Sequence, residues 1–282
     1  MTTVGLLVCL FAADPAEDKA PFQEWLKFYG AAAAKYQIDV QNGAGQFEPI
    51  QLQPMPILQY TNPERGYQQH GAFYVWTLKG RPQCIGSIWS TVPADDPQHR
   101  WVAHELHSLS SGPLRSQHEP RDGRRGPVPQ WATQQPGITW ITADDVPAPA
   151  GTPSLRLVQM RRLAEQFTVR ITNPTQGTEG DLRLLPKPLY RYPAETEGAV
   201  DGGLFAFVMG TDPEVLLLIE ATPSDQGAAS RWRFGLARFT HIQAVAQRNG
   251  ELVWQCDNAE PYVGHNPYFL YWRLHPAGLT TP

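Results

Sequence analysis

The sequence predicts an α+β fold made by tandem duplication of one unit, a helix followed by an antiparallel sheet of four or five strands. The main observation is an internal repeat. The heptapeptides PMPILQY (54–60) and PKPLYRY (186–192) align after a shift of 132 residues, the difference between positions 54 and 186. Other pairs that align at this shift, or at 131 after one deletion, are Phe73 with Phe205 and Trp101 with Trp232.

Each unit is expected to begin with a helix. Residues 21–38 combine apolar residues at helical spacing with a run of alanines, and residues 153–171 have the pattern of an amphipathic helix. Both segments start with proline, which is tolerated in the first turn of a helix. The chain is therefore divided into two predicted domains, residues 21–150 and residues 151–282, of which the second carries a C-terminal extension.

Strands are expected after each helix, because apolar runs are separated by turns rich in Gly, Pro and Asp. A unit of this kind has the layering of cystatin-like or NTF2-like domains, a comparison of architecture that implies no function. The two units are expected to pack face to face as an internal pseudo-dimer. The predicted strands are residues 71–78, 83–90, 100–109 and 138–144 in the first unit and residues 203–210, 215–222, 231–240 and 251–257 in the second.

Three kinds of segment fall outside the predicted helices and strands of the two units. Residues 111–137 have the composition of a surface loop, although a loop this long is unusual inside a compact domain. Residues 267–274 lie outside the repeat and are expected to form a closing strand or an interface segment. The Pro-x-Pro sequences at 54–56 and 186–188 restrict the chain to extended conformations and favour an edge position in a sheet.

Charge and the N-terminal residues limit the partners and the location. The net charge of −4 argues against nucleic acid, because phosphate binding needs a basic surface. Residues 5–13 form an apolar run that is too short to span a bilayer and is typical of a signal-peptide core, although no Lys or Arg precedes it. Residues 1–20 are therefore predicted to be a leader, and the protein is predicted to be exported to the periplasm or cell envelope. A cytoplasmic protein is the alternative.

Two segments resemble known sequences. LRLLPKPLYRYPAETEGAVDGGLFAFVMGTDPEVLLLIEA (182–221) resembles a signature of a family of uncharacterised bacterial proteins, which often begin with a leader. WVAHELHSLSSGPL (101–114) resembles a second signature of the same family. The resemblance supports export, but it implies no activity and supplies no catalytic residues.

The candidate site is centred on the predicted strand 100–109. Side chains alternate between the faces of a strand, so Glu105 and His107 share one face and His104 points to the other. Two ligands are too few for a metal, so no metal is predicted unless a histidine such as His70 or His118 arrives from elsewhere. The residue aligned with Glu105 in the second unit is Leu236, which indicates a buried face. A buried carboxylate must be paired, and His107 is the expected partner.

These residues support three interpretations. The first is a polar pair that only stabilises the following loop. The second, which we adopt, is a non-enzymatic ligand-binding or interaction protein of the cell envelope, whose partner is an unknown small molecule or protein and which needs no cofactor. The alternative is a small-molecule hydrolase or isomerase that uses Glu105 and His107 as an acid–base pair in a cleft. The predicted ligand-binding residues are His104, Glu105, His107, Arg115 and His118. The sequence leaves open whether the protein is an enzyme and whether Cys84 and Cys256 form a disulfide.

Overall fold

Strands dominate the fold. The computed structural model describes residues 19–63, 68–118, 130–173, 177–223 and 230–278, which include two helices, and strands make up 52% and helices 11% of these residues. The prediction of an α+β fold built from helix-plus-sheet units is wrong. The protein is mostly β, and its second half forms one curled sheet of nine strands instead of a small sheet covered by a helix.

The helices are shorter than predicted, and strands follow them directly. The helix α1 (Lys19–Ala33) is followed by β1 (Tyr36–Gln41), and α2 (Pro153–Ala164) is followed by β11 (Phe167–Asn173). Buried and more exposed side chains alternate along both strands, which is the period of a half-buried strand and not of a helix. The residues at the C-terminal ends of both predicted helices therefore add to the sheets.

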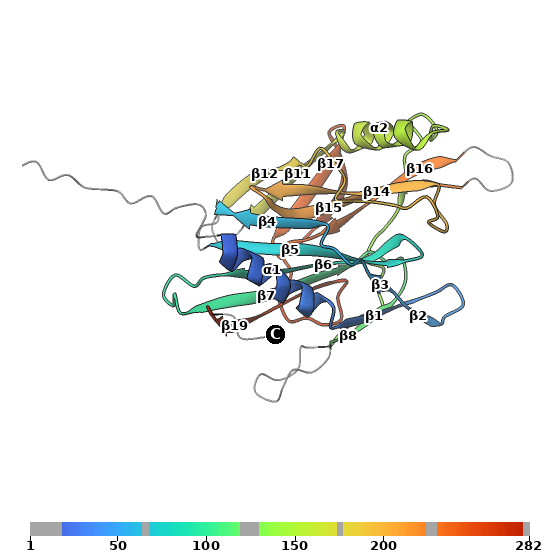
Figure 1. Ribbon diagram of the computed structural model, residues 1–282. Helices are drawn as coiled ribbons and strands as arrows, with labels where there is room; N and C mark the ends of the chain where they lie inside the picture. The colour runs from blue at the N-terminus through green and yellow to red at the C-terminus, as the bar shows by residue number, and fades with distance from the viewer. Residues whose placement is uncertain (1–18, 64–67, 119–129, 174–176, 224–229, 279–282) are drawn as a thin grey trace, which may run out of the picture.

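Two sheets, built from β1 to β9 and the C-terminal strand β19, form one half of the molecule, which we call the first half (Figure 1). The six-stranded sheet has the order β19-β7-β6-β5-β3, and β4 also pairs with β5. The four-stranded sheet has the order β2-β1-β8-β9. The strands are β2 (Phe47–Pro49), β3 (Gln51–Leu52), β4 (Leu58–Asn62), β5 (Gln69–Leu78), β6 (Arg81–Thr91), β7 (His99–Ser108), β8 (Leu114–His118), β9 (Trp131–Thr133) and β19 (Tyr268–Pro276).

Several predictions for this half are confirmed, and one is wrong. The hairpin of β5 and β6 is present, and residues 267–274 supply the closing strand β19. Pro54 and Pro56 lie between β3 and β4, two short strands that both pair with β5 at the edge of the sheet. Residues 111–137 were expected to form a surface loop, but they contain β8 and β9; residues 119–129 of this segment lie outside the described residues.

The other half of the molecule, which we call the second half, has a single sheet of nine strands, β10 to β18. Its order is β10-β16-β15-β14-β12-β11-β17-β18, with β13 paired to β14. The predicted hairpin of β14 and β15 is confirmed. Residues 138–144 and 251–257 were expected to form equivalent strands of the two units. They are not equivalent, because β10 pairs with β16 and β18 pairs with β17. The strands are β10 (Ile141–Thr142), β12 (Thr178–Leu184), β13 (Tyr190–Arg191), β14 (Asp201–Met209), β15 (Asp212–Thr222), β16 (Arg231–Arg238), β17 (Gln243–Arg248) and β18 (Glu251–Cys256).

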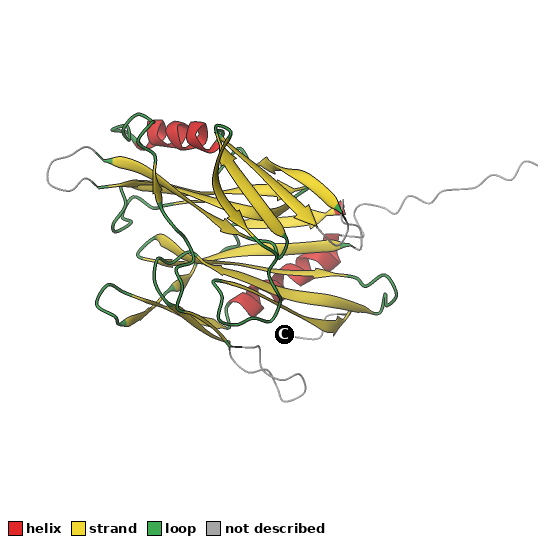
Figure 2. Ribbon diagram, turned by 180° about the vertical axis from the view of Figure 1, so that it is seen from behind, coloured by secondary structure: helices red, strands yellow, loops and turns green. Residues whose placement is uncertain are grey.

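The six-stranded and nine-stranded sheets pack against each other through an apolar cluster. Phe73 and Ile85 from β5 and β6 meet Leu216 and Leu218 from β15 in this cluster, and all four side chains are fully buried. Each helix covers the face of its sheet that is turned away from this apolar cluster (Figures 1 and 2). The helix α1 contacts β5 and β6, and α2 contacts β14 and β15. Each half also has its own core, so the molecule contains two cores and an apolar interface between them.

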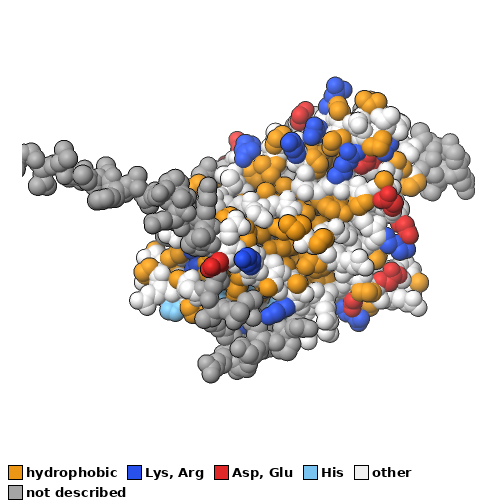
Figure 3. Space-filling model, in the orientation of Figure 1, with side chains coloured by type: hydrophobic (Ala, Val, Ile, Leu, Met, Phe, Trp, Pro, Cys, Tyr) orange, Lys and Arg blue, Asp and Glu red, His pale blue; other side chains and the backbone are white. Residues whose placement is uncertain are grey.

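In Figure 3, Lys and Arg side chains gather over the upper half of the molecule, and hydrophobic side chains gather across the middle, where the two halves meet. Within the described residues, no helix combines the length and the apolar composition needed to cross a membrane. Cys84 and Cys256 are free thiols. The predicted leader lies outside the described residues, except for Lys19 and Ala20, which begin α1.

Candidate functional site

Strand β7 presents the predicted residues on the two faces expected from its alternation. Its neighbours are β6 and β19, and the register places Glu105 opposite Ser87 on β6 and Leu270 on β19. Two residues earlier, Ala103 lies opposite Trp89 and Trp272. Glu105 therefore shares its face with Ala103 and the two tryptophans, and all of them are held by regular strands.

Glu105 is a buried carboxylate with two hydrogen-bond donors. Only 8% of the residue is exposed, and the Nε1–H group of Trp89 donates to Oε2 over 3.0 Å. The hydroxyl of Tyr268 on β19 donates to Oε1 over 2.5 Å. Burial, and then the negative charge of Glu105, raise the pKa of Tyr268 well above its usual value. Tyr268 therefore keeps its proton and remains a donor to Glu105 over the ordinary pH range.

His107, the expected partner of Glu105, has a different environment. Its Nδ1 atom lies 2.6 Å from the backbone oxygen of Ser108. The side chain lines a cavity of about 410 Å³ together with Tyr268, Arg238 and Cys256. The guanidinium of Arg238 lies 5.1 Å from the ring centroid of Tyr268 and donates to the backbone oxygens of Thr240 and Ile242.

Glu105 itself lines another cavity, of about 430 Å³, which we call the interface pocket. Its walls come from the six-stranded sheet, from the start of β15 in the nine-stranded sheet, and from the residues directly after β16. Because Glu105 and His107 line separate cavities, the arrangement gives no support to an acid–base pair in one cleft. The pocket is defined by three tryptophans and three carboxylates: Trp89, Trp101, Trp272, Glu105, Asp212 and Glu214.

The second half supplies pocket residues that the sequence analysis did not identify. Asp212 and Glu214 belong to the TDPE sequence, which reads as a turn, yet both lie at the start of β15 and are 8% and 2% exposed. Asp212 accepts a hydrogen bond from Nε2 of Gln69 over 2.9 Å. The pairing of β14 with β15 shifts register at Glu214, which has no opposite residue on β14, and both carboxylates line the interface pocket. Their signal in the sequence was the acidic alternation at the start of an otherwise apolar strand.

The other predicted site residues lie away from the interface pocket. His104 is buried on the opposite face of β7, where its Nδ1 atom lies 2.7 Å from the hydroxyl of Tyr36. The ring of His118 lies 4.5 Å from the ring centroid of Tyr36, so these two histidines meet at the same tyrosine. Arg115 is half exposed on β8 and donates to Asp39 over 2.9 Å. The structure thus separates the five predicted residues into four environments: the interface pocket, the cavity at His107, the contact with Tyr36, and the exposed ion pair with Asp39.

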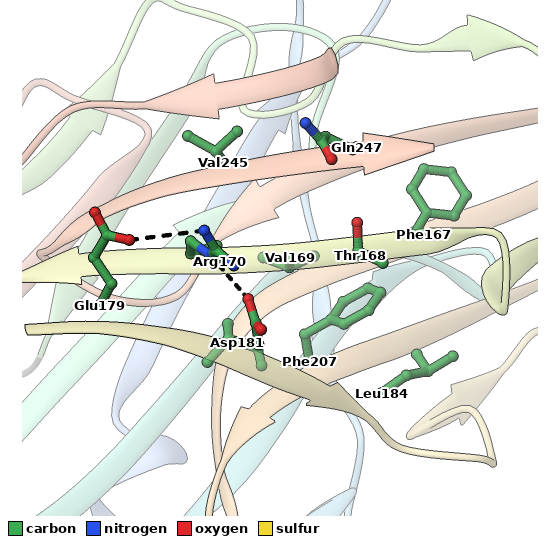
Figure 4. A pocket seen from close by; sticks show the side chains of 11 residues that line it. Phe167, Thr168, Val169, Arg170, Glu179, Asp181, Leu184, Phe207, Val245 and Gln247 are labelled. Carbon is green, nitrogen blue, oxygen red and sulfur yellow. Dashed lines mark hydrogen bonds and ion pairs between the residues drawn. The ribbon is translucent and has the colours of Figure 1, made fainter. Parts of the chain in front are cut away.

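A third cavity, of about 560 Å³, lies on the nine-stranded sheet (Figure 4). Phe167, Val169 and Phe207 contribute apolar side chains to it. Arg170 stands between Glu179 and Asp181 in Figure 4 and forms ion pairs with both, and all three side chains are more than half exposed. The attraction between the two charges of an exposed ion pair is weak and is screened by salt. This cavity therefore has fewer buried polar groups to orient a ligand than the interface pocket.

We expect acid to destabilise the protein between pH 6.5 and about 4 through His107. Burial lowers the pKa of His107 from 6.5 to about 4. In this range the unfolded chain binds a proton that the folded chain excludes, so stability falls as the pH falls, and His107 adds nothing further below pH 4. In His107→Gln, the difference in free energy of unfolding between pH 7.5 and pH 4.5 should shrink by about 2 kcal/mol in urea titrations. An unchanged difference would contradict this assignment.

No group of three His, Cys, Asp or Glu side chains in the described part of the chain is positioned to hold a metal ion. The interface pocket combines three tryptophans and Glu105 on the six-stranded sheet with Asp212 and Glu214 on the nine-stranded sheet. Comparison of the chain with protein-family models, with curated proteins and with solved structures finds no match.

Proposed function

We propose that this chain is a non-enzymatic binding protein whose small-molecule ligand occupies the interface pocket. The observation that carries the proposal is the convergence of three tryptophans and three buried or nearly buried carboxylates on one cavity. Ligand sites are concave, mostly apolar, and contain a few fixed polar groups that orient the ligand. A cavity of about 430 Å³ lies within the size range of such sites.

The rigidity of the pocket also supports binding. Its residues lie on β6, β7, β15 and β19 or directly after β16, and Glu105 is held by Trp89 and Tyr268. A site on regular strands loses little conformational entropy when it binds a ligand. Both segments that resemble the bacterial family, residues 101–114 and 182–221, contribute residues to this pocket.

The proposed location is the cell envelope. It depends on the apolar residues 5–13 and on the family resemblance. N-terminal sequencing of the mature protein tests it, because an intact Met1 would contradict cleavage of a leader.

A thermal-shift screen with a library of small molecules tests the proposed function. A ligand that binds only the folded protein raises its apparent stability, by about 2.7 kcal/mol at a concentration of 100 times Kd. We expect at least one compound class to raise Tm of the wild type and to raise Tm of Glu105→Gln much less. The substitution keeps the shape of the side chain but removes its charge and one strong acceptor.

Glu197→Gln is the matched control. Glu197 is exposed and paired with Lys79, and neither residue lines the pocket. Its variant should respond to ligands as the wild type does. The proposal is contradicted if no compound stabilises the wild type, or if the compounds that do so stabilise all three proteins equally.

A further inference from the structure

We infer that the ligand of the interface pocket is a saccharide, whose pyranose ring lies against the tryptophan wall. The inference rests on the proposed function, because it names the ligand class of the same pocket. It follows from three properties of the pocket: the aromatic wall, the acceptors that face it, and the volume between them.

The aromatic wall is organised around Ala103. Trp89 and Trp272 lie opposite Ala103 on the two neighbouring strands, and Trp101 precedes it by two residues on the same face. Neighbouring strands are about 4.8 Å apart, so the backbones of Trp89 and Trp272 are about 10 Å apart. Ala103 is fully buried against both indoles, whereas all three tryptophans keep part of their surface exposed. The small alanine thus allows three large rings to share one wall.

This wall suits a ligand with an apolar face. Indole rings offer a large, rigid contact area, and they still expose surface that packing in the folded chain does not cover. Tyr262 contacts Trp272, and the two ring centroids lie 5.2 Å apart. The C–H groups on one face of a pyranose ring can pack against such a surface.

The remaining walls suit a ligand with several hydroxyl donors. Asp212 and Glu214 on β15, Glu105 on β7 and Thr240 after β16 all line the same cavity. An ionised carboxylate only accepts hydrogen bonds and has about four acceptor sites, so these groups offer acceptors to hydroxyl donors. Acceptors on separate strands match donors that are spread around a ring, as the hydroxyls of a sugar are. A buried polar site rejects ligands that leave its groups unpaired.

The size of the pocket indicates a short saccharide. A cavity of about 430 Å³ is near the small end of ligand sites, which span roughly 300–1,000 Å³. We therefore expect a monosaccharide or disaccharide unit, or the end of a longer glycan, and not the middle of a long chain.

Titration of the full chain with sugars and with organic cations tests the inference. The probes are methyl glycosides of common hexoses, N-acetylglucosamine, maltose and cellobiose, with choline and tetramethylammonium as cations that also bind aromatic sites. Binding is followed by tryptophan fluorescence and by calorimetry. We expect at least one sugar to bind the wild type, and Trp101→Ala and Trp272→Ala to weaken this binding at least tenfold.

Trp254→Ala is the matched control, because Trp254 lines the neighbouring cavity with His107 and not the interface pocket. It undergoes the same chemical change and should bind the sugar as the wild type does. Circular dichroism confirms that each variant is folded, and Asp212→Asn provides a second variant without a change of shape. Its expected effect is also at least a tenfold loss.

The outcomes separate this inference from the proposed function. Binding of sugars that is lost in the pocket variants and kept in Trp254→Ala supports the saccharide. Binding of cations without sugars overturns the saccharide and leaves the proposed function standing. Sugar binding that the pocket variants do not change overturns the inference, and a wild type stabilised by none of these probes and by no compound of the library overturns both.

Discussion

Replacement of Glu220 by glutamine is expected to lower the free energy of unfolding by about 3–5 kcal/mol. Glu220 lies on β15 and is completely buried. Its Oε1 atom accepts from the guanidinium of Arg233, and its Oε2 atom accepts from Arg81 over 2.9 Å and from Tyr192 over 3.2 Å. Removal of the negative charge leaves two largely buried guanidinium groups without a counter-ion. This costs more stability than replacing the whole ion cluster with apolar side chains would.

Urea unfolding of Glu220→Gln and of Glu197→Gln measures this effect. Both variants remove one carboxylate from an ion pair, but the Lys79–Glu197 pair is exposed and screened by solvent. The unfolding midpoint of Glu197→Gln should stay close to that of the wild type. Equal midpoints for the two variants would show that the Arg81–Glu220–Arg233 cluster does not stabilise the fold.

Replacement of Trp76 by alanine is expected to cost about 3–5 kcal/mol, because it creates a large cavity in the first core. Trp76 is 1% exposed and packs edge-on against Tyr36, with ring centroids 6.1 Å apart. Trp101→Ala makes the same chemical change at a residue that is 38% exposed, and its cost should be less than half as large. Urea unfolding at one temperature compares the two. A larger loss in Trp101→Ala would contradict the assignment of Trp76 to the core.

The long apolar strands could be predicted from the sequence, and the short polar ones could not. The runs at 203–210 and 215–222 are almost entirely apolar and are separated by a turn, so both their type and their pairing were clear. β8 alternates one buried and one exposed residue over only five positions, and its polar side chains resemble those of a loop. β1 and β11 follow helices directly, and their apolar residues were compatible with either period over so short a span.

The sequence predicted the side-chain directions along one strand of the candidate site, but not the residues that other strands contribute to it. Alternation along β7 correctly placed Glu105 and His107 on one face and His104 on the other. The donors to Glu105 include Tyr268, which is 163 residues away in the sequence, and the facing carboxylates belong to β15. These contacts depend on how the two sheets pack, and no local pattern in the sequence specifies that packing.

The pairing of β7 with β19 has a consequence for the synthesis of the protein. Tyr268 follows Glu105 by 163 residues, so at about 5–20 residues per second it leaves the ribosome roughly 8–30 s later. During this interval the edge of β7 that will pair with β19 has no partner strand from its own chain. An unpaired edge can pair with a second nascent chain. The wall of the interface pocket that is completed last is thus also an edge at which two nascent chains can associate before β19 is made.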